Sequence, residues 1–278
     1  MEKINRITVE HILEKKRRHQ KITMLTAYDY PLASLIDQAG IDIILVGDSL
    51  ANVVLGLEST REIGMEEMLH HAKAASRGVK TALLIGDMPY GSYKDEKLAV
   101  KNAKRFISEA GCNAVKLEWF DDCPSVAGAM VDAGIAVMGH VGLTPQTLKS
   151  KEEFKVQGKD AASAKKIITH AKDLEKKGCF SIVLECIPDK IAEIITKTLK
   201  VPTIGIGAGV HCDGQVLVTH DILGLFDRYK PKFVKQYAKI NDSILEAIFR
   251  YRDEVLQGKF PNEEHRFTIK EEEIDKLK

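Results

Sequence analysis

The sequence lacks the features that would place it in a membrane or outside the cell. No run approaches the ~20 apolar residues of a membrane helix. Charges such as Lys3, Arg6 and Glu10 stand where a signal peptide would be apolar. The five cysteines include no CxxC pair, which argues against a zinc site and a disulfide framework. We therefore expect reduced thiols in a cytoplasmic protein.

A surplus of charge of either sign is also absent. The 41 basic and 40 acidic residues leave a formal net charge of +1, which gives no reason to expect nucleic acid or anionic lipid as a partner. One basic run, Lys15–Arg18, continues a helix-like start. We interpret it as a solvated helix face.

Short apolar runs alternate with longer amphipathic stretches along the chain. Near-continuous apolar runs are what a parallel sheet covered on both faces requires. The predicted strands are Ile22–Tyr28, Ile41–Asp48, Thr81–Asp87, Ala114–Glu118, Ala136–Val141, Ser181–Glu185, Thr203–Gly207 and, more weakly, Gln215–Val218. The predicted helices include Pro31–Ala39, Met65–Arg77, Lys97–Glu109, Ala161–Lys177 and Lys190–Leu199.

Eight βα units in 278 residues fit an α/β fold of the (β/α)₈ TIM-barrel type, which takes roughly 250 residues. A doubly wound open sheet is the alternative. No fixed-period repeat or composition shift marks a second domain. We interpret residues 1–278 as one barrel domain with a short N-terminal helical segment and a charged C-terminal tail. Asn241–Leu256 predicts one more amphipathic helix, and the tail from Glu263 predicts disorder or subunit contacts.

Polar residues close several of the apolar runs. In barrels the C-terminal strand ends form the active-site face, so side chains at several strand ends converge. A single acid there is commonly a helix N-cap, an explanation that weakens for the whole set. Two members lie two apart within one run and therefore share a face of the strand. The set is Asp48 with Ser49, Asp87, Lys116 with Glu118, His140 and Glu185.

Carboxylates without a histidine or cysteine cluster favour a hard, oxygen-preferring cation such as Mg²⁺. A 2-oxo acid could replace some of the waters of that ion, and the metal would polarise the ketone and stabilise an enolate. Glu185 is then free to act as a base, although it could instead cap the next segment or pair with Lys116. The pattern indicates metal-assisted chemistry next to a carbonyl.

Four other features are candidate sites, and the first three favour structural roles. The glycine cluster Gly205–Gly209 indicates a turn or close backbone packing more than a phosphate cradle. His70 and His71 fall in a predicted helix, which favours a surface or supporting role. Cys186 should face away from Glu185 as a core thiol. Ser49 has no histidine partner for a triad, so it is better suited to binding substrate.

Nine segments, in order along the chain, resemble the ketopantoate hydroxymethyltransferase family, also called 3-methyl-2-oxobutanoate hydroxymethyltransferase. They are TAYDYPLASLIDQAG (26–40), VGDSLANVVLG (46–56), GDMPYGSY (86–93), VKLE (115–118), MGHVGLTPQ (138–146), KVQGK (155–159), VLECIP (183–188), IGIGAG (204–209) and DGQVLVTHDILG (213–224).

The resemblance implies roles residue by residue. Asp48, Asp87 and Glu118 match the family's Mg²⁺ ligands, and Asp48, Ser49, Asp87 and Lys116 match its oxo-acid contacts. Glu185 matches its proton acceptor, and His140 lies in a motif that lines its active site. The family transfers a one-carbon unit from 5,10-methylenetetrahydrofolate to 3-methyl-2-oxobutanoate, giving 2-dehydropantoate for pantothenate synthesis. Its members form cytoplasmic homo-oligomers, often decamers.

The chain departs from the family pattern at three places. Trp119-Phe120 stands where two glycines are usual, Ala51 replaces a glycine, and the loop 57–63 has its own sequence. These changes bear on which oxo acid and which one-carbon donor are used.

Two alternatives remain at this point. The first is a Mg²⁺-dependent lyase or mutase of the phosphoenolpyruvate mutase and isocitrate lyase type. Such enzymes typically carry a catalytic cysteine in a KKCGH-like loop, a setting that none of the five cysteines here has. The second is a non-enzymatic barrel that binds a metabolite or a partner protein.

Overall fold

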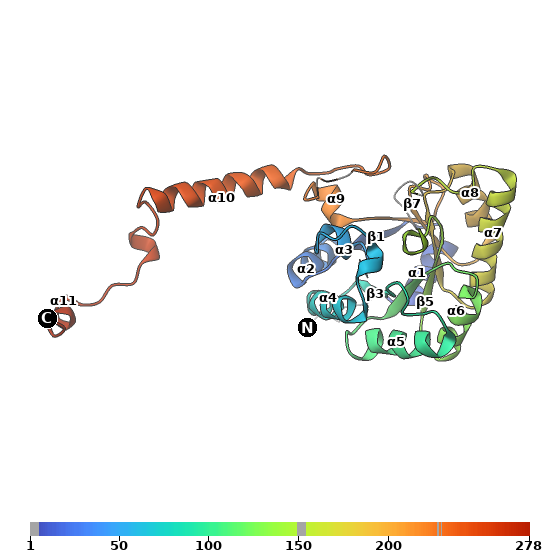
Figure 1. The fold of residues 1–278 in the computed structure, drawn as a ribbon, viewed down its shortest axis with the longest axis horizontal. Coiled ribbons are helices and arrows are strands. Elements are labelled where there is room, and N and C mark those ends of the chain that lie inside the picture. Colours follow the sequence, from blue (N-terminus) through green and yellow to red (C-terminus); the bar gives the residue numbers. More distant parts are fainter. Residues whose placement is uncertain (1–5, 149–153, 227, 229) are drawn as a thin grey trace.

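Eight parallel strands close into a barrel in sequence order, with β1 pairing with β8 (Figure 1). The computed structural model describes residues 6–148, 154–226, 228 and 230–278. Because the sheet is closed, the predicted (β/α)₈ barrel is confirmed and the alternative of a doubly wound open sheet is excluded. The strands are β1 (Ile22–Thr26), β2 (Ile43–Val46), β3 (Leu83–Asp87), β4 (Ala114–Glu118), β5 (Val137–Gly142), β6 (Ser181–Glu185), β7 (Thr203–Ile206) and β8 (Gly214–Leu217).

The helices surround this barrel. Asp29, Asp95 and Asp160 begin three of them, each accepting a hydrogen bond from a backbone N–H of the first turn, as N-caps do. None of the described helices is both long and apolar enough to cross a membrane. The outer helices are α2 (Tyr30–Gln38), α4 (Met65–Gly78), α5 (Glu96–Ser108), α6 (Cys123–Asp132), α7 (Ala161–Lys176) and α8 (Asp189–Thr198), with the short α3 (Leu50–Val53) and α9 (Thr219–Leu223).

The link from β7 to β8 is a tight turn over residues 207–213, without a helix. Gly207 and Gly209 take φ values of 63° and 82°, which side chains rarely adopt. A Cβ on Gly209 would lie 2.5 Å from the Cβ of Asp189. The glycine cluster is thus accounted for by the turn and by close packing.

Helix α1 (Val9–Arg17) closes the N-terminal end of the barrel. Its Ile12 is fully buried and joins the cluster of side chains inside the barrel, which includes Ile22 and Met24. Lys15 pairs with Asp42, and Lys16 Nζ lies 2.8 Å from Asp213 Oδ2. The prediction of a solvated basic face was therefore wrong for these two lysines, because the helix lies across the barrel end.

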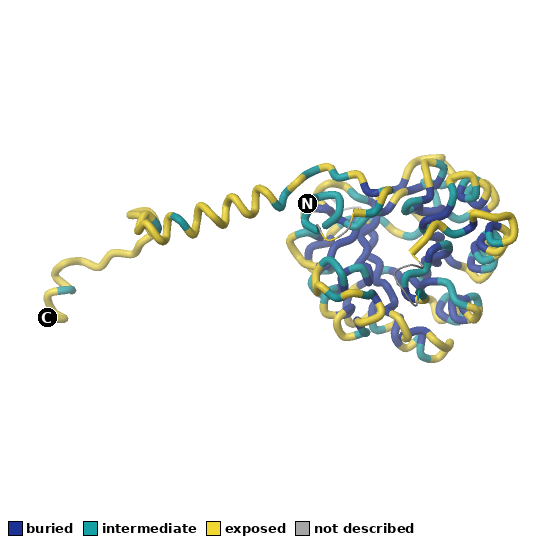
Figure 2. Tube along the Cα trace, turned by 45° about the horizontal axis from the view of Figure 1, so that its top comes forward, coloured by how far each residue is buried: buried dark blue, intermediate teal, exposed yellow. Residues whose placement is uncertain are grey.

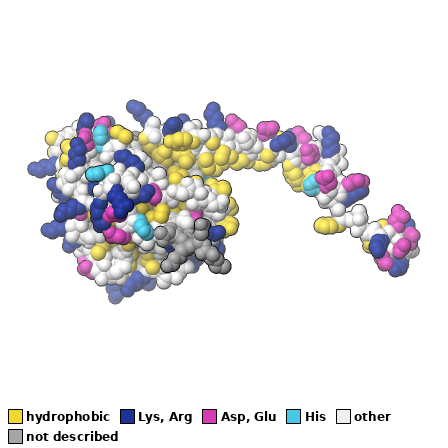
Figure 3. Space-filling view, turned by 180° about the vertical axis from the view of Figure 1, so that it is seen from behind, with side chains coloured by type: hydrophobic (Ala, Val, Ile, Leu, Met, Phe, Trp, Pro, Cys, Tyr) yellow, Lys and Arg dark blue, Asp and Glu magenta, His cyan; other side chains and the backbone are white. Residues whose placement is uncertain are grey.

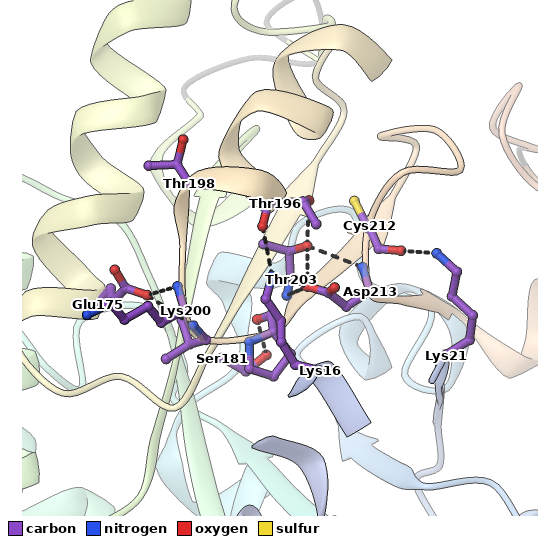
Figure 4. A network of polar contacts seen from close by, with 12 residues as sticks. Lys16, Lys21, Glu175, Ser181, Thr196, Thr198, Lys200, Thr203, Cys212 and Asp213 are labelled. Atoms are coloured by element: carbon purple, nitrogen blue, oxygen red, sulfur yellow. Dashed lines mark hydrogen bonds and ion pairs between the residues drawn. The ribbon is translucent and has the colours of Figure 1, made fainter. Parts of the chain in front are cut away.

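Carboxylates at this end satisfy the backbone N–H groups of neighbouring strands. Asp213 Oδ2 accepts from the Thr203 backbone N–H at 2.8 Å as well as from Lys16, a network shown in Figure 4. Asp42 Oδ2 likewise accepts from the Thr23 backbone N–H at 2.8 Å. A buried N–H without a partner would destabilise the fold, so these acids hold the barrel together.

We expect Lys16→Met to lower the free energy of unfolding by about 1.5–3 kcal/mol, the range for hydrogen bonds to charged groups. Both partners are mostly buried, at 14% and 16% exposure of the side chains. Urea unfolding measures the loss. Arg18→Met is the control, since its side chain is 65% exposed and its pair with Glu14 should contribute less than about 1 kcal/mol. Equal losses in the two variants would contradict the assignment.

The C-terminal segment leaves the barrel as an arm (Figures 1 and 2). It contains α10 (Ile240–Leu256), a 3₁₀ turn (Glu263–His265) and α11 (Glu271–Asp275). No residue of α10 is buried against the rest of the chain. The predicted amphipathic helix is therefore present, and its apolar side faces solvent.

Candidate active site

The predicted acids lie at the C-terminal mouth of the barrel. Asp87, Glu118 and Glu185 are the last residues of β3, β4 and β6, and Asp48 stands two residues beyond β2. Parallel strands end at the same face, which explains why residues so far apart in sequence lie together. Asp48, Asp87 and Glu118 are at most 7% exposed.

Asp87 and Lys116 form an ion pair on neighbouring strands, where they occupy paired positions. Lys116 Nζ lies 2.9 Å from Asp87 Oδ1, although that oxygen lacks a well-directed hydrogen bond. Asp87 Oδ2 accepts from the Asp48 backbone N–H at 3.2 Å. Burial raises the pKa of Asp87 despite the pairing. Burial alone would lower the pKa of Lys116, but Asp87, Asp48 and Glu118 outweigh it and raise that pKa, so the lysine stays charged.

Gln146 connects two of the acids, although the sequence predicted no role for it. Its side-chain Nε2 donates to Asp48 Oδ2 at 2.8 Å, and its backbone N–H donates to Glu118 Oε2 at 2.9 Å. Tyr93 Oη donates to Gln146 Oε1 at 2.6 Å. The only sequence signal was its position at the end of the MGHVGLTPQ segment (138–146).

His140 lies between Glu118 and Glu185. Its Nε2 is 3.1 Å from Glu185 Oε2, and its Nδ1 is 3.5 Å from Glu118 Oε1. Burial, reinforced by the charge of Lys116, lowers the pKa of His140, which favours the neutral imidazole near pH 7. Neither contact has the geometry of a directed hydrogen bond, and a neutral ring with one N–H could donate to only one of these carboxylates at a time. Glu185 thus contacts His140, and Lys116 pairs with Asp87 instead of with Glu185.

The Glu185 side chain is more open to the mouth than its neighbours, at 14% exposure. Glu118, in contrast, is almost fully enclosed, and burial followed by repulsion from Asp48 raises its pKa well above the ordinary value. An accessible carboxylate at the edge of a buried acidic cluster can reach a small substrate. The acids beneath it can instead hold a cation.

Ser49 stands on the other side of the mouth, next to the β1 end. Its Oγ lies 2.8 Å from the hydroxyl of Tyr28, which is buried, and burial raises the pKa of that phenol above its ordinary value. His71 Nδ1 contacts the Tyr28 backbone carbonyl oxygen at 2.7 Å. His71 therefore supports the backbone behind Ser49, in line with the supporting role expected from sequence.

The acid cluster has the chemistry of a Mg²⁺ site, since its donors are hard oxygens and its three carboxylates, once ionised, carry more negative charge than Lys116 offsets. Within the described ranges, no three His, Cys, Asp or Glu side chains are grouped closely enough to hold a metal between them. Mg²⁺ usually takes only one or two protein carboxylates and keeps several waters. Asp48 and Asp87 are neighbours at the mouth, since the Asp48 backbone N–H donates to Asp87 Oδ2, so their two carboxylates are the candidates for that smaller requirement.

The two aromatics that depart from the family pattern occupy different places. Trp119 follows Glu118 and faces the helices, where its ring stacks on His170 with centroids 3.7 Å apart. The ring of Phe120 packs against Tyr93 at 5.6 Å. In the loop 57–63, Arg61 donates to the Tyr90 hydroxyl at 2.9 Å.

Comparison with known proteins assigns the family. The model of the family described as ketopantoate hydroxymethyltransferase matches residues 6–263. The chain belongs to this family. A 3-methyl-2-oxobutanoate hydroxymethyltransferase of Syntrophomonas wolfei is 53% identical over 98% of this chain and 99% of its own length. One from Carboxydothermus hydrogenoformans is 49% identical over 99% and 100%.

Solved structures share the fold of this family member at low sequence identity. A phosphonopyruvate hydrolase in complex with oxalate and Mg²⁺ superposes with a TM-score of 0.63 at 13% identity, covering 92% of each chain. An oxaloacetate acetylhydrolase in complex with 3,3-difluorooxalacetate gives 0.62 at 12% identity, covering 90% of this chain and 88% of that one. These likenesses concern the barrel fold.

We expect Glu118→Gln to stabilise the metal-free protein by about 0.5–2 kcal/mol. Burial disfavours the ionised carboxylate, whereas an amide stays neutral and still accepts from the Gln146 N–H. A carboxyl whose folded pKa is raised adds stability below its unfolded pKa and loses it as the pH rises through the folded value.

The difference in melting temperature between variant and parent should therefore widen as the pH rises above about 4.3, the ordinary pKa of a glutamate carboxyl. Thermal unfolding in EDTA measures it. Glu272→Gln on the exposed α11 is the matched control and should change little. A Glu118→Gln protein that melts below the parent at every pH would refute the assignment.

Proposed function

We propose that the protein transfers a hydroxymethyl group from 5,10-methylenetetrahydrofolate to 3-methyl-2-oxobutanoate, giving 2-dehydropantoate for pantothenate biosynthesis. The full-length identity to relatives of that name supports the reaction. The observation that carries it in the structure is Glu185, an accessible carboxylate beside a buried acidic cluster at the barrel mouth.

Asp48 and Asp87 are the residues that would hold Mg²⁺, with Glu118 nearby to bind directly or through water. When bound, the ion would supply polarisation of the ketone oxygen of the substrate. Lys116 Nζ, paired to Asp87, places a positive charge where the substrate carboxylate can bind. Ser49 Oγ, held by Tyr28, offers a further hydrogen bond to the oxo acid.

Glu185 is proposed to remove the proton from C3 of the oxo acid. His140, neutral and 3.1 Å away, is close enough for Nε2 to donate to Glu185 Oε2 after a small reorientation of the ring, which would leave Oε1 free for the proton. In the overall balance, C3 loses one proton and gains CH₂OH, whose carbon comes from the donor and whose oxygen comes from water. Tetrahydrofolate leaves with two new N–H hydrogens, one that corresponds to the C3 proton and one that comes from water.

The lyase or mutase alternative is less well supported. The solved structures of related type match at 13% identity or less, which speaks for the fold alone. The relatives that match at about half identity over the full chain carry the transferase name. Turnover of 3-methyl-2-oxobutanoate that depends on methylenetetrahydrofolate would separate the two activities, because a lyase or mutase needs no folate.

We expect Glu185→Gln to retain binding of Mg²⁺ and 3-methyl-2-oxobutanoate but to lose turnover by roughly 10²–10⁴-fold, the contribution of a general base. Glutamine keeps the size and the hydrogen-bonding ability of the side chain and removes the basic oxygen. The direct measurement is exchange of the C3 proton in D₂O, followed by NMR in the absence of folate.

Glu193→Gln is the matched control, because Glu193 lies on the surface of α8 and pairs with Lys190 and Lys197. It should exchange at the parental rate. Parental exchange in Glu185→Gln would identify another group as the base. Absence of Mg²⁺-dependent exchange in the parent itself would count against the proposed reaction.

A homo-oligomer, a decamer if it follows the family resemblance, is the proposed assembly. Helix α10 carries apolar residues at helical spacing, among them Ile244 (41% exposed), Ile248 (54%) and Tyr251 (60%), and Figure 3 shows hydrophobic side chains along it. The outer faces of β1 and β8 expose Thr23 and Gln215, whereas β3 and β4 are buried throughout. A second copy can place its α10 over such an uncovered stretch.

We expect Ile248→Asp to shift the protein to smaller species, because a charge in an apolar contact is strongly unfavourable. Light scattering after size-exclusion chromatography measures the mass. Arg250→Gln, an exposed polar change on the same helix, should leave the mass unchanged. A parent protein that is monomeric, or an Ile248→Asp variant of parental mass, would refute the proposed role of α10.

A further inference from the structure

We infer that Gln146 is a positioning residue, which fixes the carboxylates of Asp48 and Glu118 and is itself oriented by Tyr93. The inference rests on the proposed function of these acids. Gln146 lies in the 3₁₀ turn Pro145–Thr147 after β5, yet it is fully buried. A loop glutamine buried to this degree must make all of its hydrogen bonds with the protein.

The side-chain amide uses both kinds of hydrogen-bonding atom. Its Nε2 donates to Asp48 Oδ2 at 2.8 Å and to the Met88 carbonyl oxygen at 3.0 Å. Its Oε1 accepts from the Tyr93 hydroxyl at 2.6 Å. A carbonyl oxygen only accepts and so requires the NH₂ group beside it. The orientation of the amide is therefore fixed by its partners.

The main chain of Gln146 adds the second connection. Its N–H donates to Glu118 Oε2 at 2.9 Å, so one residue holds oxygens from the β2 and β4 ends. Burial of Glu118 and then repulsion from the Asp48 charge raise the pKa of Glu118. Donors from Gln146 keep these two acids in place against that repulsion.

The neutrality of Gln146 is what suits it to this role. An arginine or lysine at this place would pair with Asp48 and cancel the charge that a divalent cation needs. An amide donates without adding charge, so the carboxylates keep their affinity for a cation. Groups that orient metal ligands in this way typically affect metal affinity or activity by 10–100-fold when changed.

Tyr93 orients the Gln146 amide from the side away from the acids. It is 7% exposed, and its ring packs on Phe120, with centroids 5.6 Å apart. The Tyr93 hydroxyl donates its hydrogen bond to Gln146, which in turn donates to Asp48 and Glu118, so Tyr93 positions these acids through the amide. The aromatic at position 120, which departs from the family pattern, therefore contacts the support of the acid cluster.

The test uses Gln146→Met, which keeps the length of the side chain and removes the amide, and Tyr93→Phe, which removes one oxygen. Mg²⁺ binding is measured by calorimetry on the folded proteins in the presence of 3-methyl-2-oxobutanoate, together with kcat and KM. Gln38→Met is the matched control, because Gln38 is exposed on α2 and its side chain donates to Ser34, away from the barrel mouth.

We expect Mg²⁺ affinity to fall by about 10–100-fold in Gln146→Met and by a smaller factor in Tyr93→Phe, with Gln38→Met unchanged. The double variant should bind Mg²⁺ no more weakly than Gln146→Met alone, because Tyr93 acts through the amide. Additive losses would overturn that link. Parental affinity and turnover in Gln146→Met would overturn the positioning role. Should Gln146→Met fail to fold, unchanged affinity in Tyr93→Phe would count against it.

A crystal structure of Gln146→Met separates this inference from the proposed function. The Asp48 carboxylate should move from its place beside residue 146, whether or not Mg²⁺ is added. An unmoved carboxylate would overturn the inference even in an active enzyme. A parent protein that binds neither Mg²⁺ nor the oxo acid would instead count against the proposed function, and the position of Asp48 would still decide the role of Gln146.

Discussion

Burial of like charge at the mouth of the barrel is the constraint around which the site is organised. Asp48, Asp87 and Glu118 lie in a nearly enclosed space beside Lys116. The lysine offsets part of their repulsion, and neutral donors from Gln146 satisfy oxygens without cancelling charge. Such an arrangement lowers the stability of the fold. Departures of this kind from stable packing are common at functional sites.

Interactions at the opposite end of the barrel offset this loss of stability. There the acids are matched, since Asp42 and Asp213 each accept from a strand N–H and from a lysine of α1. Ile12 fills the interior between these pairs. Stability is thus concentrated at the N-terminal end and reactivity at the C-terminal end, the usual division in barrels of this kind. The two can vary separately because the packed interior lies between them.

Local sequence patterns were sufficient for the strands and for the acids that end them, because strand period and parallel direction decide where Lys116, Glu118 and Glu185 point. Gln146 could not be found in this way. It lies in a short turn without periodicity, and its burial comes from contacts with residues far away in sequence. The pairing of Lys16 with Asp213 likewise depends on where α1 docks, so a basic run alone suggested a solvated face.

Trp119 and Phe120 are adjacent in sequence but pack in different places, one against the outer helices and the other near the acid cluster. A strand alternates its side chains, so Trp119 turns outward from Glu118 and stacks on His170 of α7. Phe120, just beyond the strand, packs on Tyr93 and so contacts the hydrogen bonds that lead to Asp48. A change at position 119 alters the packing between barrel and helices. A change at position 120 is transmitted to the acid cluster by one ring contact and two hydrogen bonds, which makes it the departure that bears more directly on the site.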